Sequence, residues 1–234
     1  MKFAYLIEPP FNYREPDGSV TGGDVELARY VLGELGHEFE PVEAEFAELL
    51  PGLAAGRWRM TTGLFATEER RKLALFSRPI WALPDGILLP RGNPSGATGY
   101  TSLAATSARV AVIRDQVQHR SAVQFGVPPD RILIFETYEQ AAQAVNSGEA
   151  DAYVSVARAH LGYLVQNPHL DLDVVTVPPS EKPAAKGSFG FSLQDTALCR
   201  AADEILQAFI GSPRHRAMMA TFGFTDAEID LLFE

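Results

Sequence analysis

Cysteine and long apolar runs are almost absent from this sequence. Its single cysteine, Cys199, has no partner within the 234 residues, so no internal disulfide can form, and no cysteine and histidine spacing typical of a metal site occurs. We therefore expect neither a metal nor a cofactor, and we interpret Cys199 as a small buried apolar residue. No run approaches the roughly 20 apolar residues that a membrane-spanning helix requires. The apolar run Met1 to Ile7 ends at Glu8-Pro9-Pro10, too early for a signal peptide, and indicates a first strand.

Positive charge is also scarce. The chain has 20 lysines and arginines against 30 aspartates and glutamates, a net charge of -10, and no stripe rich in lysine or arginine. Such a surface repels phosphate backbones, which excludes nucleic acid as an expected partner. The hydrophobic fraction of 46% and the charged fraction of 21% are typical of a globular protein. The length is sufficient for two lobes of roughly 100 residues each.

The first 90 residues alternate between predicted strands and helices. The pattern predicts strands at 3–7, 58–62 and 86–90, helices at 24–36, 45–56 and 67–75, and a loop at 63–66. Asp24 is the expected N-cap of the first helix, and Gly36 and Gly56 are expected to end the first two helices.

The alternation is interrupted once and then begins again. Residues 91–103 are rich in Gly, Asn, Pro, Ser and Thr, which predicts a linker. Beyond it, strands are predicted at 109–113, 131–135, 152–156 and 173–177, and helices at 121–127 and 138–146. A second proline-rich crossing at 177–183 precedes a predicted strand at 187–193 and a helical C-terminal segment.

This order of elements predicts an α/β protein with two lobes, each a mixed sheet flanked by helices, joined by two hinge strands. We expect a discontinuous first lobe of residues 1–90 and 182–234 and a continuous second lobe of residues 91–181. Domain junctions and the carboxyl ends of strands commonly bind ligands, so a ligand site is expected in a cleft between the lobes. Ligand binding would then shift the population from open to closed lobes.

Several short segments occur in an order that resembles family 3 solute-binding proteins. They are PPFNY, DGSVTGGDVELA, FAELLPGLAAGRW and TEERRKLALFSRPIW in the first lobe, SGEADAYVS in the second lobe, and SFGFSL and FGF near the C-terminus. The resemblance implies a periplasmic-binding-protein type II fold that binds an amino acid or a related carboxylate. It also implies a monomer outside the cytoplasm that delivers its ligand unchanged to the permease of an ABC transporter, after removal of any export signal.

The resemblance also implies residue roles in the first lobe. Arg70 would grip the ligand carboxylate, a task suited to the paired donors of a guanidinium. Phe46 would stack on the ligand, Gly63 and Phe65 would contact it through the loop before Arg70, and Glu8 could meet a cationic group. Taken from the residues alone, the alternatives are that Arg70 is a solvated helix charge, Phe46 a core residue of its own helix, and Glu8 a solvated carboxylate.

Three departures from the family pattern concern the amino end of an amino-acid ligand. Phe65 replaces a hydroxyl residue, Val156 stands where amino-acid binders have an aspartate for the α-ammonium group, and Arg114-Asp115-Gln116 replaces a Gly-Thr backbone nest. The ligand is therefore expected to be an amino acid or a decarboxylated, N-substituted, cyclic or aromatic carboxylate. The polar residues expected to contact its far end are Ser155, Asp115, Gln116 and Glu136.

Two other functions remain open from the sequence. One is an enzyme similar to cyclohexadienyl dehydratases, in which Glu8, Asp115 or Glu136 would serve as the general acid, although the Gly-Gly-Thr-rich second-lobe loop of those enzymes is missing. The other is a sensing module that reports its ligand to a kinase or a channel. We expect no catalysis and favour transport.

Overall fold

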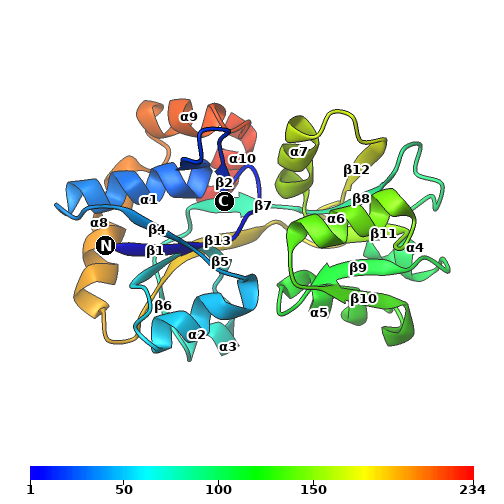
Figure 1. Ribbon diagram of the computed structural model, residues 1–234, viewed down its shortest axis with the longest axis horizontal. Coiled ribbons are helices and arrows are strands. Elements are labelled where there is room, and N and C mark those ends of the chain that lie inside the picture. The colour runs from blue at the N-terminus through cyan, green and yellow to red at the C-terminus, as the bar shows by residue number, and fades with distance from the viewer. The chain divides into compact units, whose positions relative to one another are not determined.

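The computed structural model describes all residues from 1 to 234 and contains two compact units (Figure 1). Unit 1 comprises Met1–Ala82 and Lys186–Glu234, and unit 2 comprises Leu83–Ala185. The first boundary therefore lies before, and not after, the strand predicted at 86–90. That strand, β8 (Asp85–Pro90), pairs with two strands of unit 2 and so belongs to the second unit.

Unit 1 is built on a six-stranded mixed sheet in the order β4-β1-β5-β13-β6, with β7 paired to β13. Strand β1 (Lys2–Tyr5) lies parallel to β4 (Glu40–Glu43) and β5 (Met60–Phe65). The returning strand β13 (Ala185–Phe191) runs antiparallel to β5 and β6 (Leu75–Phe76). The remaining strands are β7 (Trp81–Leu83) and the hairpin of β2 (Tyr13–Arg14) and β3 (Val20–Thr21).

Helices lie on both sides of this sheet, and α1 and α2 bury apolar residues there. Helix α1 (Gly23–Glu34) lies on one side, and α2 (Leu49–Ala54) and α3 (Glu68–Arg71) lie on the other (Figure 1). The ring of Tyr30 in α1 stacks on Phe209 with centroids 3.9 Å apart. The other helical segments of unit 1 are η1 (Phe46–Glu48), α8 (Thr196–Phe209), α9 (Pro213–Ala220), α10 (Asp226–Asp230) and η3 (Leu231–Phe233).

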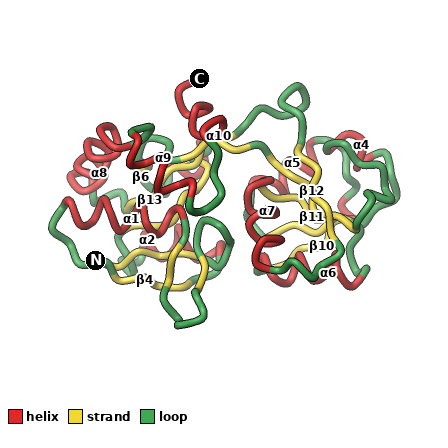
Figure 2. The backbone as a smooth tube through the Cα atoms, turned by 90° about the horizontal axis from the view of Figure 1, so that it is seen from above, coloured by secondary structure: helices red, strands yellow, loops and turns green.

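Unit 2 contains a five-stranded sheet in the order β10-β9-β11-β8-β12. Strands β9 (Val110–Ile113), β10 (Ile132–Phe135) and β11 (Ala152–Val156) are parallel, whereas β8 is antiparallel to both β11 and β12 (Leu172–Thr176). Helical segments enclose the strands (Figure 2). They are α4 (Tyr100–Ala104), α5 (Val117–Gln124), η2 (Pro129–Arg131), α6 (Tyr138–Ser147) and α7 (Ala157–Gln166).

The two crossing segments of the chain are tied together within unit 2. Asp85, 2% exposed, accepts hydrogen bonds from the Tyr100 hydroxyl at 2.7 Å and the Gln118 amide at 2.9 Å, and forms an ion pair with Lys182. Glu181 accepts from the backbone N–H groups of Tyr100 (3.0 Å) and Thr101 (2.6 Å). Because residues 181 and 182 bind unit 2 so closely, the second boundary lies at Lys186 and not at 182.

None of the helices is both long and apolar enough to span a lipid bilayer.

Candidate ligand-binding site

Arg70 is buried although it stands in a run of charged residues. Helix α3 begins after Thr67, whose Oγ1 accepts a hydrogen bond from the Arg70 backbone N–H at 3.3 Å. The Arg70 side chain donates from Nη1 to the Phe65 carbonyl at 3.1 Å, and its guanidinium carbon lies 5.1 Å from the centroid of the Phe46 ring. Arg70 is only 6% exposed, whereas the next residue, Arg71, is exposed. The alternative of a solvated helix charge is therefore wrong for Arg70.

Phe46 contacts both the core of unit 1 and the side chain of Arg70. It begins η1, not the regular helix predicted from residue 45, and it is half-buried. One side of it packs on a cluster that includes Ala4, Leu49 and Leu53, while its ring also lies under the Arg70 guanidinium. Phe46 therefore packs on the core and also makes a cation–π contact with the buried Arg70.

Gly63 and Phe65 belong to strand β5 and not to the predicted loop. The Gly63 N–H donates to Asp24 Oδ2 at 2.8 Å, so this amide is already committed within the protein. The Phe65 carbonyl accepts from both Arg70 and the Thr67 N–H, the latter at 3.0 Å, and its ring packs edge-on against Trp81. Phe65 therefore shapes the site through its carbonyl and its ring.

Asp24 makes hydrogen bonds near Phe65 that the sequence did not predict. It was expected as a helix N-cap, but the N-cap is Gly22 and Asp24 lies inside the first turn of α1. Its carboxylate, 1% exposed, accepts from Thr62 Oγ1 (2.7 Å), the Gly63 N–H (2.8 Å) and Trp81 Nε1 (3.1 Å). Burial raises the pKa of Asp24 to about 6, against which these hydrogen bonds act. An acidic residue among the apolar residues of a helix was the one signal available in the sequence.

Glu8 lies in the turn after β1 and is nearly buried, at 9% exposure. Its backbone N–H donates to the Asn12 carbonyl at 2.9 Å, and its own carbonyl accepts from the N–H groups of Phe11 and Asn12. The alternative of a fully solvated carboxylate does not hold for Glu8.

In unit 2 the predicted residues gather at one edge of the sheet. Asp115 and Gln116 follow β9, Glu136 follows β10, and Ser155 is the penultimate residue of β11, so all four lie at the carboxyl ends of parallel strands. Asp115 has a left-handed backbone, with φ of 62°. Gln116 is 5% exposed, and its side-chain oxygen is buried without a hydrogen-bond partner. Ser155 is 1% exposed.

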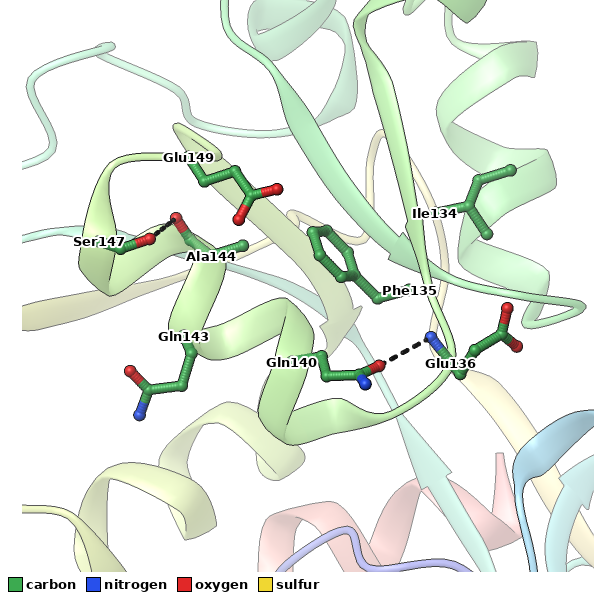
Figure 3. A pocket seen from close by; sticks show the side chains of 8 residues that line it. All are labelled: Ile134, Phe135, Glu136, Gln140, Gln143, Ala144, Ser147 and Glu149. Atoms are coloured by element: carbon green, nitrogen blue, oxygen red, sulfur yellow. Dashed lines mark hydrogen bonds between the residues drawn. The ribbon is translucent and has the colours of Figure 1, made fainter.

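Glu136 is paired with a neighbouring arginine. It forms an ion pair with Arg114 at 2.7 Å, and this hydrogen-bonded pairing lowers the pKa of Glu136. It also lines a groove of about 500 Å³ between β10 and α6, in which Figure 3 places Glu136 at one end and Ser147 and Glu149 near the other. No other predicted site residue lines this groove.

The structure contains no group of three or more His, Cys, Asp or Glu residues that could hold a metal ion.

Comparison with known proteins gives the family. Residues 2–224 match the model of the bacterial extracellular solute-binding proteins, family 3. The chain belongs to this family. The α/β two-lobed fold class predicted from the sequence is confirmed by the solved structures that this solute-binding protein resembles.

Two curated relatives of this solute-binding protein extend over nearly its whole length. A probable amino-acid ABC transporter periplasmic-binding protein, y4tE, of Sinorhizobium fredii (strain NBRC 101917 / NGR234) is 27% identical over 97% of the chain and 77% of the relative. The arginine-binding protein ArgT of Corynebacterium glutamicum is 30% identical over 95% of the chain and 73% of the relative. Among solved structures, EhuB in complex with hydroxyectoine aligns with a TM-score of 0.87 and 26% identity, covering 98% of the chain and 90% of EhuB.

Proposed function

We propose that this solute-binding protein binds an amino acid or amino-acid derivative through its carboxylate and delivers it to the permease of an ABC transporter. The observation that carries the proposal is the buried guanidinium of Arg70. The names of the relatives, which include amino-acid and arginine binders and a complex with hydroxyectoine, support this class of ligand. We propose that the protein acts outside the cytoplasm as a monomer and leaves the ligand chemically unchanged.

The surroundings of Arg70 suit a carboxylate clamp. A guanidinium carries five N–H donors in a fixed plane, which matches the two oxygens of a carboxylate, and the hydrogen bond to the Phe65 carbonyl fixes the orientation of that plane. The Phe46 ring covers one face and restricts water there. A buried, oriented guanidinium binds a carboxylate more strongly than an exposed one, because the charges attract each other in a medium of lower dielectric constant.

The residues of unit 2 favour a ligand that differs from a plain α-amino acid. Val156 is neutral and 6% exposed, so it cannot pair with an α-ammonium group. Gln116 and Ser155 are buried polar residues that could contact such a ligand through hydrogen bonds instead. We therefore propose N-substituted and cyclic carboxylates beside standard amino acids, and a thermal-shift screen of amino acids, opines, betaines and aromatic carboxylates identifies the class.

The clamp is tested by calorimetry on Arg70→Ala with the compound that stabilises the wild type most in that screen. Loss of a charged partner for a desolvated carboxylate costs about 3 kcal/mol, so we expect affinity to fall by about 100-fold or more. Arg71→Ala is the matched control, because Arg71 is the exposed neighbour on the same short helix, and its affinity should stay within about threefold of the wild type. Wild-type affinity in Arg70→Ala would show that Arg70 is not the clamp.

The absence of catalysis is tested separately. The stabilising compound and prephenate are each incubated with the purified protein and examined by NMR. We expect each compound to be converted no faster with the protein than in a control without protein. Any protein-dependent conversion that scales with protein concentration would replace the transport proposal with an enzymatic one.

A further inference from the structure

We propose that Asp24 is a positioning residue for the ligand site, holding the end of β5 and the Trp81 ring so that Phe65 can fix Arg70. This inference rests on the proposed function. It concerns a carboxylate that lies within the fold of unit 1 and is connected to Arg70 by a short series of contacts.

The first step is the set of donors that Asp24 collects. Although Asp24 belongs to α1, its hydrogen-bond donors come from β5 and β7: the Thr62 hydroxyl, the Gly63 N–H and the Trp81 indole. Thr62 in turn accepts from the Asn12 amide at 2.8 Å, which fixes the direction of its hydroxyl. Burying a carboxylate costs free energy unless its oxygens accept hydrogen bonds. The three hydrogen bonds to Asp24 therefore fix the positions of Thr62, Gly63 and Trp81 relative to α1.

The second step is the confinement of Trp81. A Cβ placed on Gly187 would lie 2.1 Å from the Trp81 ring, and one placed on Gly63 would lie 2.8 Å from its Nε1, so the indole fills the space that these two glycines leave. The Phe11 ring lies 5.5 Å away on another side. Because its Nε1 also donates to Asp24 at 3.1 Å, the orientation of the Trp81 indole is fixed.

The third step connects this frame to the guanidinium. Trp81 meets the Phe65 ring edge-on, with centroids 5.3 Å apart and planes at 83°. Gly63, whose amide Asp24 holds, precedes Phe65 by two residues on the same strand. Both routes from Asp24 therefore end at Phe65, whose carbonyl accepts from Arg70 at 3.1 Å.

A purely structural role would show itself differently. A carboxylate that only stabilised the start of α1 would bind the N–H groups of its own first turn, but the hydrogen-bond donors to the Asp24 carboxylate lie on β5 and β7. Removing such a structural group would loosen unit 1 as a whole. Removing a positioning group should loosen residues 63–72 and change the geometry around Arg70.

The first test needs no ligand. Deuterium uptake is compared in the wild type, Asp24→Asn, and Trp58→Phe as the matched control. Trp58 is the other buried tryptophan of unit 1, and its indole donates to the Leu49 carbonyl at 2.9 Å. We expect Asp24→Asn to raise the exchange rate of residues 63–72 by at least tenfold while β1 keeps its protection. Trp58 shares a hydrophobic cluster with Leu64, so Trp58→Phe should raise the rate at 63–72 by no more than about threefold. Equal loss of protection across unit 1, or no change at 63–72, would overturn the inference.

The second test measures affinity by calorimetry with L-arginine and hydroxyectoine as probes. We expect about a tenfold weaker affinity for Asp24→Asn, a smaller loss for Trp81→Phe, which keeps a ring but lacks the N–H, and no more than a twofold change for Trp58→Phe. In a double-mutant cycle, Asp24→Asn should have no further effect once Arg70 is alanine, because positioning acts only through Arg70.

The outcomes separate the two proposals. Wild-type affinity in Arg70→Ala would contradict the carboxylate clamp itself. Loss of binding in Arg70→Ala together with wild-type affinity and wild-type protection of 63–72 in Asp24→Asn would leave the clamp in place and overturn the role of Asp24. Should neither probe bind the wild type, the exchange experiment decides on Asp24 alone.

Discussion

The surroundings of Cys199 determine the pKa and the reactivity of its thiol. The residue is half-buried in α8, less buried than the sequence suggested. Burial, with a smaller contribution from the Asp203 charge, raises the pKa of its thiol to about 11. Because the thiolate is the reactive form, we expect reaction with an aromatic disulfide reagent at pH 8 to be at least about tenfold slower than for free cysteine. The released thiolate is followed by absorbance. Reaction at the free rate in the folded protein would contradict this, and unfolding in urea should restore that rate.

The contrast between Arg70 and Arg71 marks the limit of sequence interpretation at this scale. Both stand in the same charged run, and nothing in the run separates them. Arg70 is buried because the Phe46 ring and the Phe65 carbonyl, from two other segments, meet it in space. Its candidacy came from resemblance to a family and not from the residues themselves. Asp24 was interpreted only as a helix N-cap for the same reason, since its donors lie 38 to 57 residues away in the chain.

At the scale of elements, most periodic strands and helix α6 were predictable, whereas helices α4 and α7 were not. The strands predicted at 131–135 and 152–156 match β10 and β11 within a residue. Helix α7 was not predicted, because Gly162 lowers the helical propensity of the segment; packing of Ala159, His160 and Tyr163 stabilises the helix instead. Helix α4 lies in the segment predicted as a linker, where the Glu181 carboxylate binds its first N–H groups, a contact that spans 80 residues.

The ion pair of Asp85 and Lys182 gives a prediction about the two crossing segments. Asp85→Ala would leave the Lys182 ammonium and the Tyr100 hydroxyl without their acceptor, so we expect a loss of about 3 kcal/mol in the free energy of unfolding of unit 2. The double variant Asp85→Leu with Lys182→Met should lose less, because neither charge remains buried. Denaturant unfolding monitored by circular dichroism measures both. A double variant less stable than Asp85→Ala would show that the unpaired Lys182 charge does not cause the loss of stability.

At the scale of the whole molecule, the alternation of strands and helices predicted the α/β fold class. The boundaries between the two units depend on which strands pair with each other, and the hydrophobic periodicity of the sequence does not specify those partners. Strand β8 looks like the last strand of unit 1 in sequence order, but its register places it between β11 and β12 of unit 2. Long-range pairing decides membership of a sheet, and a local apolar run carries no information on its partner.

The two units are expected to respond differently to acid. In unit 2, His160 is fully buried, with Nδ1 2.6 Å from the Tyr138 hydroxyl and Nε2 3.3 Å from the Gly86 carbonyl, and burial lowers its pKa to about 3. Below the ordinary histidine pKa of about 6.5 the unfolded chain binds a proton that folded His160 does not, so unit 2 loses stability as the pH falls, by up to about 1.4 kcal/mol per pH unit.

Unit 1 contains two buried groups whose effects oppose each other over the same range. The pKa of Asp24 is raised to about 6, so the folded state binds its proton first and unit 1 gains stability between about pH 6 and pH 4. Burial lowers the pKa of His215 to about 4, which removes stability between about pH 6.5 and pH 4. We therefore expect hydrogen exchange, corrected for its intrinsic pH dependence, to show unit 2 destabilised from pH 6.5 to 4.5 while unit 1 changes little. In Asp24→Asn only the His215 contribution remains, so unit 1 should lose stability between pH 6.5 and 4.5. If unit 1 of this variant were equally stable at both pH values, the two contributions would not cancel in the wild type.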